Sequence, residues 1–254
     1  MDLIFKLRQN TVFDFNVKKI VMKKVINSWF LFFLFMGFVL TLQTGCKSDE
    51  PNLETITDID GNAYHIVTIG TQTWMVENLK TTKYRDGTNI PSVTENAAWA
   101  ALKTGACCDY NNEASMSKKY GKLYNMYAIA DSRNLAPAGW HVANDSDWII
   151  LTTFLGGDSI AGGKLKETGT THWTSPNVGA TNEVVFTALP GGYRQQNGEF
   201  GGIGNYSYFW SPATSDYSGA FIPCYRGIFH KYVYIYRFEV YWQSGFSVRC
   251  VRDK

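Results

Sequence analysis

Residues 29–42 form an uncharged apolar run near the start of the chain. The run is shorter than the roughly 20 residues that cross a bilayer as a helix, which is typical of the centre of a signal peptide. Lys23 and Lys24 precede it, directly after Met22, as the basic start of a signal peptide should. We therefore predict a signal peptide over residues 1–45 that truly starts at Met22, with a long basic N-terminal region over residues 1–21 as the alternative.

The run ends at Leu42-Gln43-Thr44-Gly45-Cys46, which resembles a bacterial lipobox with Gln43 where leucine is usual. The resemblance implies cleavage before Cys46 and palmitate-type acylation of its thiol. The alternative is an ordinary secretory signal that leaves Cys46 as a free thiol. Because several acyl chains hold a protein firmly whereas one binds marginally, we expect a lipoprotein anchored on the outer membrane of the cell envelope.

Residues 46–57 are predicted to be a tether between the anchor and the folded domain. The stretch Lys47-Ser48-Asp49-Glu50 is short and acidic, and it resembles the surface-export signal of Bacteroidetes lipoproteins. It equally fits a solvated linker, since it is followed by Pro51 and carries little apolar surface. We expect one folded domain over residues 58–254, which is long enough to bury its own core.

The folded part is rich in aromatic side chains (15% of the whole chain) and in glycine (23 residues). Aromatic rings bury a large area each, and glycine permits irregular backbone, so the composition favours a loop-rich domain over a helical bundle. The net charge of only +2 gives no electrostatic signal for nucleic acid. We therefore expect no nucleic-acid partner.

The pattern of apolar residues predicts an α+β domain. Asn144 as N-cap and Gly156 after the last turn predict one helix, in which Trp148, Leu151 and Leu155 share a face. A β-hairpin is expected over residues 64–76. Later strands are expected over residues 184–189, 208–211, 233–238 and 245–251. Helices early and strands late argue against alternating βαβ units.

Five motifs, in this order, resemble the Fibrobacter succinogenes major paralogous domain. They are Ile69-Gly70-Thr71-Gln72-Thr73-Trp74-Met75-Val76-Glu77-Asn78-Leu79, Tyr120-Gly121-Lys122-Leu123-Tyr124-Asn125, Leu135-Ala136-Pro137-Ala138-Gly139-Trp140-His141-Val142, Leu189-Pro190-Gly191-Gly192 and Ser247-Val248-Arg249-Cys250-Val251. The resemblance implies a C-type-lectin-like fold, in the variant shared with formylglycine-generating enzymes. Such a fold has a twisted antiparallel sheet, few helices and long loops.

Four cysteines remain when Cys46 is set aside, and an even number in an exported protein favours disulfides. They are Cys107, Cys108, Cys224 and Cys250, and the residues alone leave all three connectivities open. The family resemblance implies a bridge between Cys108 and Cys250, which leaves Cys107 and Cys224 for a second one.

No catalytic constellation is found in the sequence, so we expect no enzyme. The histidines show no i, i+4 pair for zinc, and no Gly-x-Ser-x-Gly elbow occurs. No cofactor is expected, except that Asp109, Asn111, Asn112 and Glu113 form an oxygen-rich segment that is a weak candidate for calcium and otherwise a turn.

Aromatic residues late in the chain are the best candidates for binding, because sugars and peptides stack on exposed rings while arginine fixes their orientation. The candidates are Tyr193, Arg194, Trp210, Tyr234 and Trp242. We expect a surface-exposed, non-catalytic binding or adhesion module for glycan or protein ligands. The alternatives are a structural envelope protein without a small ligand and an uncharacterised enzyme.

Overall fold

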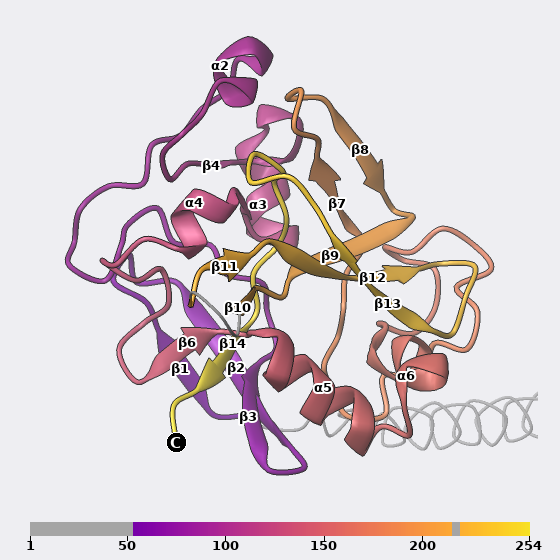
Figure 1. The fold of residues 1–254 in the computed structure, drawn as a ribbon. Coiled ribbons are helices and arrows are strands. Elements are labelled where there is room, and N and C mark those ends of the chain that lie inside the picture. Colours follow the sequence, from indigo (N-terminus) through magenta and orange to yellow (C-terminus); the bar gives the residue numbers. More distant parts are fainter. Residues whose placement is uncertain (1–52, 215–218) are drawn as a thin grey trace, which may run out of the picture. The chain divides into compact units, whose positions relative to one another are not determined.

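The structure is a computed structural model, and it describes residues 53–214 and 219–254 (Figure 1). The predicted signal peptide, Cys46 and the tether up to residue 52 lie outside the described residues. Residues Leu53–Lys254 form one compact unit. None of the helices within the described ranges is long and apolar enough to cross a membrane.

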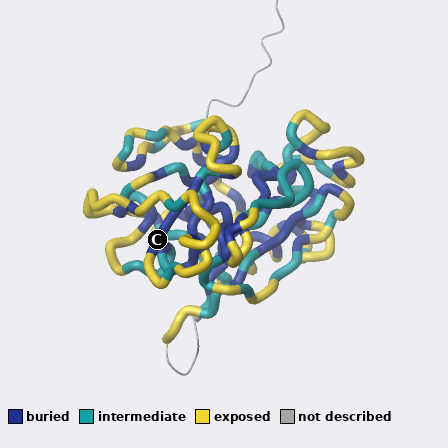
Figure 2. The backbone as a smooth tube through the Cα atoms, turned by 90° about the horizontal axis from the view of Figure 1, so that it is seen from above, coloured by how far each residue is buried: buried dark blue, intermediate teal, exposed yellow. Residues whose placement is uncertain are grey.

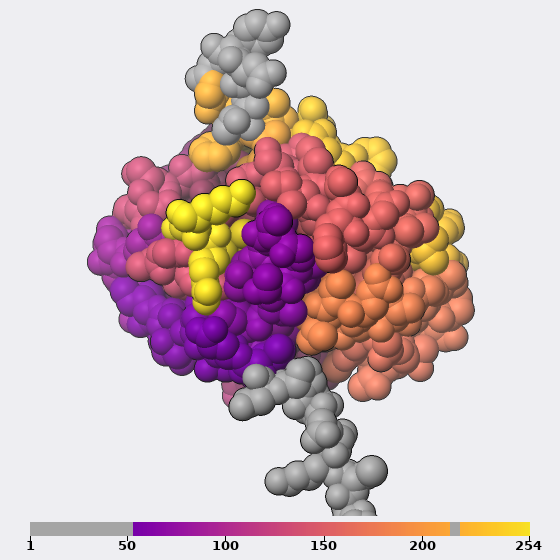
Figure 3. Space-filling model, turned by 90° about the horizontal axis from the view of Figure 1, so that it is seen from below, coloured from indigo at the N-terminus to yellow at the C-terminus, as the bar shows by residue number. Residues whose placement is uncertain are grey.

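The first sheet joins the beginning of the domain to its end. Its strand order is β1 (Thr55–Thr57), β2 (Ala63–Ile69), β3 (Gln72–Met75), β14 (Cys250–Arg252) and β6 (Trp140–Val142). All neighbours run antiparallel. The predicted hairpin is β2 and β3, and its turn contains Gly70 at a φ of 59°. In Figure 3 the yellow C-terminal residues lie against the indigo segment of this hairpin, where Val251 pairs with Trp74.

The domain begins earlier than the sequence indicated. Thr55 to Thr57, which we expected to belong to the tether, form strand β1 and pair with residues 63–65 of β2. All three residues are β-branched, which favours a strand, and polar and apolar side chains alternate, so Ile56 packs against the core while the two threonines face solvent.

The second sheet carries most of the aromatic residues of the late chain. Its order is β13 (Ile235–Glu239), β12 (Cys224–Phe229), β9 (Tyr206–Trp210), β7 (Gly191–Arg194) and β8 (Phe200–Ile203). Its strand pairs are antiparallel except for β7 with β9, which is parallel. Two short antiparallel pairs complete the strands: β10 (Ala213–Thr214) with β11 (Phe221–Ile222), and β4 (Cys107–Cys108) with β5 (Leu123–Tyr124).

The helices of the described residues are short. They are α2 (Asn96–Ala100), the 3-10 turn η1 (Tyr110–Asn112), α3 (Ala114–Tyr120), α4 (Met126–Ile129), α5 (Asp145–Phe154) and α6 (Asp158–Leu165). The predicted helix is confirmed as α5. Asn144 and Asp147 form a reciprocal capping box at its start, which satisfies two backbone N–H groups that the helix leaves open. Few helices with many antiparallel strands make an α+β, sheet-rich fold, as predicted.

One expected strand is absent. Residues 184–189 do not form a strand, and Val185 and Thr187 adopt positive φ angles of 57° and 52°. Their segment is held by the buried Arg249, whose guanidinium donates to the carbonyl groups of Phe186 and Thr187 at 2.9 and 3.1 Å. These carbonyls therefore bond to an arginine instead of to a neighbouring strand.

A largely aromatic core cluster joins β3 of the first sheet, helix α5 and β9 of the second sheet. Trp74, Trp148, Phe186 and Phe209 are fully buried and contact one another, with ring centroids 5.1–6.0 Å apart. Figure 2 shows the buried backbone in the middle of the domain and the exposed backbone in its outer loops. The rings thus supply the large buried area per residue that the composition indicated.

Candidate functional site

A groove of about 550 Å³, which we call the Trp242 groove, combines an aromatic pair with polar and charged side chains. It is lined by Asn89, Pro91, Lys103, Thr104, Gly105, Tyr127, Ala130, Asp131, Arg133 and Trp242. Ligand sites commonly combine apolar or aromatic walls with a few convergent polar groups, and this groove has that composition.

The two rings of the groove come from segments far apart in the sequence. Tyr127 lies on α4 and Trp242 on the connection from β13 to β14; their ring centroids are 5.0 Å apart at an interplanar angle of 44°. The backbone N–H of Met126 donates to the carbonyl of Trp242 at 2.9 Å. Both residues are half-buried and line the groove.

Asn125 fixes two walls of the groove at once. Its Oδ1 caps α4 by accepting from the N–H of Ala128 at 3.0 Å, and it also accepts from the N–H of Ala106 at 2.9 Å. Its Nδ2 donates to the carbonyl of Thr104 at 2.9 Å. A single buried amide therefore holds the helix that carries Tyr127 next to residues 104–106.

Arg133 is held in one orientation at the rim of the groove. Its Nε and Nη2 donate to the two carboxylate oxygens of Asp131 at 2.9 and 2.7 Å, and its Nη1 donates to Oγ1 of Thr88 at 3.0 Å. The guanidinium also lies 4.0 Å above the ring of Tyr84. The hydrogen bond from Arg133 lowers the pKa of Asp131 to about 2. The pair is therefore charged on both sides at neutral pH.

Of the five predicted binding residues, only Trp242 lines this groove. Trp210 is fully buried, and its Nε1 donates to the carbonyl of Tyr124 at 2.7 Å, so it is a core residue. Arg194 is fully buried as well, between the rings of Trp99 and Phe200. The prediction of these two as surface binding residues is wrong, because their polar groups satisfy backbone carbonyls inside the domain.

The other two candidates lie elsewhere on the second sheet. Tyr193 is half-buried and stacks on Tyr208, with ring centroids 5.0 Å apart at 13°. Tyr234 is 40% exposed and stacks on Tyr232 in the turn before β13. Neither lines the Trp242 groove. Sequence reasoning missed Tyr127 and Arg133, since neither residue stands in a motif that distinguishes it from the other aromatic and charged residues of the chain.

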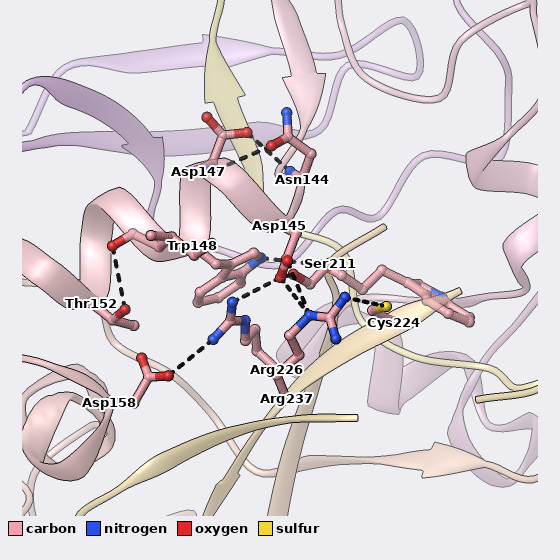
Figure 4. A network of polar contacts seen from close by, with 12 residues as sticks. Asn144, Asp145, Asp147, Trp148, Thr152, Asp158, Ser211, Cys224, Arg226 and Arg237 are labelled. Atoms are coloured by element: carbon pink, nitrogen blue, oxygen red, sulfur yellow. Dashed lines mark hydrogen bonds and ion pairs between the residues drawn. The ribbon is translucent and has the colours of Figure 1, made fainter. Parts of the chain in front are cut away.

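A second polar centre surrounds Asp145 at the start of α5 (Figure 4). Arg226 Nη2 donates to Asp145 Oδ1 at 2.8 Å, and Arg237 Nε lies 3.0 Å from both oxygens. Arg226 also reaches Asp158 at 3.4 Å, and Arg237 Nη2 donates to Sγ of Cys224 at 3.0 Å. The Asp145 carboxylate is therefore paired with two guanidiniums at once.

This centre borders a cavity of about 520 Å³ that includes His141, Asn144, Asp145 and Phe221. Ser211 Oγ donates to Asp145 at 3.1 Å, and no histidine among the described residues is bonded to it. Burial raises the pKa of the Cys224 thiol, so at neutral pH the nucleophilic thiolate is scarce. The network is therefore suited to holding α5 and α6 against the second sheet.

The predicted calcium segment is occupied by an ion pair. Asp109 accepts from Nζ of Lys122 at 2.7 Å and from the hydroxyl of Ser117. Although burial alone would raise the pKa of Asp109, these hydrogen bonds hold it below its usual value. Asn111 and Asn112 are in left-handed turn conformations, and Glu113 is exposed. Within residues 53–214 and 219–254 no group of three His, Cys, Asp or Glu could hold a metal ion.

The predicted disulfides are not formed in the part of the chain that the structure describes. Cys107, Cys108, Cys224 and Cys250 are all free thiols and all buried. Cys107 and Cys108 are neighbours on β4, so their side chains point to opposite faces and belong to different core clusters. The Sγ atom of Cys224 accepts a hydrogen bond from Arg237 and forms no disulfide.

These observations define residues 53–214 and 219–254 as an α+β domain with two five-stranded sheets, buried polar groups that hold its segments together, and an aromatic groove on its surface. The chain matches the Fibrobacter succinogenes major domain over residues 67–252 and belongs to that family. No curated protein and no solved structure matches it. The C-type-lectin-like character of the fold remains a prediction from the resemblance.

Proposed function

We propose that the protein is a surface-exposed lipoprotein whose domain binds a glycan, without catalysis, in the Trp242 groove. The observation that carries this proposal is the pairing of Trp242 with Tyr127 beside oriented polar side chains. The apolar face of a sugar ring stacks on aromatic rings, and its hydroxyls need donors and acceptors at the rim. Asn89, Thr104 and Asp131 supply such groups in the same groove.

A non-catalytic role is supported by the polar chemistry of the described residues. The Asp145 carboxylate is paired with Arg226 and Arg237, and the Asp131 carboxylate with Arg133. A general base needs a pKa near the working pH, whereas the hydrogen bond from Arg133 lowers the pKa of Asp131 to about 2. Binding is thus the simplest use of the groove, and a structural envelope protein is the alternative.

A glycan array probed with the chain from residue 47 onward tests the proposal. This chain retains the whole described domain and lacks the cysteine that we expect to be acylated. We expect a restricted set of glycans to bind, and Trp242→Ala to reduce their affinity by about two- to tenfold, since one stacked ring contributes roughly 0.5–1.5 kcal/mol.

Phe154→Ala is the matched control. Phe154 is an aromatic residue on α5, 59% exposed, and it does not line the groove. Its removal should leave glycan binding unchanged. Absence of binding to every glycan, or equal loss in the two variants, would argue for the structural alternative.

A further inference from the structure

We infer that the Trp242 groove selects an acidic saccharide, whose ring lies on Trp242 and Tyr127 and whose carboxylate is bound by Arg133 and Lys103. This inference rests on the proposed glycan-binding function and adds the chemical class of the ligand. It follows from the donors that Arg133 leaves open and from the balance of charge in the groove.

Arg133 is prepared for an anion. A guanidinium has five N–H groups. Three of those on Arg133 are engaged by Asp131 and Thr88, which leaves two for a ligand. Stacking on the ring of Tyr84 fixes the plane of the group. Because the side chain is already ordered, a carboxylate that binds it incurs little of the usual entropic cost.

The charges that line the groove favour an anion. Lys103 and Arg133 are its cations, and Asp131 is its carboxylate. Both oxygens of Asp131 are bonded to Arg133, so Lys103 remains as an exposed cation with no ion pair among the described residues. Asp86, the other carboxylate that acts on Arg133, accepts two hydrogen bonds from Thr88 and does not line the groove.

The ring pair argues for a saccharide as the carrier of this anion. Trp242 and Tyr127 are tilted by 44° to one another, so together they present a shallow aromatic corner within the groove. A hexuronic acid unit has an apolar ring face to place in this corner and a carboxylate on the ring to reach a cation. An acidic peptide has the carboxylate and lacks the flat ring face.

The test compares pentasaccharides of galacturonic and glucuronic acid with their fully methyl-esterified forms, by calorimetry on the chain from residue 47 onward. Esterification removes the charge and keeps the backbone and length. We expect the acids to bind about tenfold more tightly at low salt. The advantage should shrink at high salt, because counterions screen exposed charges.

Substitutions at Lys103 and Arg133 test whether these two residues cause the preference for acids over esters. Lys103→Gln should weaken the acids about three- to tenfold and leave the esters unchanged. Lys118→Gln removes an equal charge from an exposed site on α3 and should change neither. Arg133→Lys keeps the charge and loses the planar fork, so it should also weaken the acids. An unchanged unfolding midpoint shows that each variant is folded.

Each contrary result has a distinct meaning. Equal binding of acids and esters, with Trp242 required, would overturn the acidic preference and leave the glycan-binding function standing. If neither the acids nor their esters bind while neutral glycans bind on the array, the acidic preference is likewise overturned and the glycan-binding function stands. A blank array together with no calorimetric binding would overturn both. Competition by poly-glutamate, with no effect of Trp242→Ala, would make the ligand an acidic polypeptide and overturn the inference.

Discussion

Arg249 donates from Nε to Oδ1 of Asn78 at 2.7 Å, although 171 positions separate the two residues in the chain. Asn78 in turn donates from Nδ2 to the carbonyl of Tyr120 at 2.7 Å. Gly121 follows at a φ of 77°, and a Cβ there would lie 2.5 Å from that of Asn78. Three of the five sequence motifs therefore meet at one buried amide, which indicates that the motifs encode the scaffold.

Arg249→Met should destabilise the domain strongly. The fully buried guanidinium also donates to the carbonyls of Met75, Phe186 and Thr187, and it lies 4.3 Å from the Phe186 ring. Its loss leaves four buried or part-buried acceptors without a donor, at about 1 kcal/mol or more each, so we expect a total of about 4 kcal/mol or more. Urea unfolding followed by tryptophan fluorescence measures the change.

The matched control for this prediction is Arg252→Met. Arg252 lies three positions later in the chain, on β14, and its side chain is 43% exposed. It is an exposed arginine with one long ion pair, so its loss should cost less than about 1 kcal/mol. Similar destabilisation by both substitutions would contradict the role assigned to Arg249.

His141 should increase the free energy of unfolding at acidic pH, and this contribution should disappear as the pH rises. Its Nε2 lies 2.9 Å from Asp147 and its Nδ1 2.7 Å from Asp253, an arrangement that favours the imidazolium. The hydrogen bond to Asp147 raises the pKa of His141, and burial opposes it only in part. A raised folded-state pKa gives stability that is complete below the unfolded value of about 6.5 and is lost as pH rises through the folded value.

The free energy of unfolding of the wild type and of His141→Gln, measured in urea at pH 5.5 and 8.5, checks this sign. The difference between the two proteins should be larger at pH 5.5. Because the side chain is 37% exposed, we expect less than about 1 kcal/mol. Asp253→Asn removes one of the two partners and should reduce the pH dependence in part. A difference that grows with pH would refute the proposed linkage.

Local signals predicted the parts of the fold that local physics determines. Asn144 and Asp147 close a capping box within four residues of chain, so α5 could be read from the sequence. Residues 184–189 were misread as a strand because the arginine that captures their carbonyls lies 62 and 63 positions away. An apolar, β-branched run predicts a strand only where no distant side chain takes its hydrogen bonds.

Of the residues that line the Trp242 groove, only Trp242 was predicted from the sequence as a binding residue. Trp242 stood out as a late aromatic residue, but Trp210 and Arg194 have the same composition cues and are buried. What distinguishes them is the position of a carbonyl acceptor, such as that of Tyr124 for Trp210, 86 positions away. Lys103 and Arg133 join Trp242 through tertiary structure alone, which no sequence period indicates.

The cysteines offer a direct chemical test of the bonding in the domain. Burial raises the pKa of Cys107 to about 11 and that of Cys108 to about 12, and both Cys224 and Cys250 are buried. We therefore expect almost no reaction of the native chain from residue 47 onward with Ellman's reagent at pH 8. In denaturant, without a reductant, four thiols should react. Two or none would show that bridges form in the mature protein.

Acylation of Cys46 should decide where the protein resides. We expect a palmitate analogue fed to the cells to label the wild type, and Cys46→Ala to abolish the label and release the protein from the membrane fraction, because no helix of the described residues is long and apolar enough to cross a membrane. Gln43→Leu is the matched control: it restores the usual lipobox residue and should keep or increase the label. Label that persists in Cys46→Ala would place the lipid elsewhere and remove the basis for a surface-displayed groove.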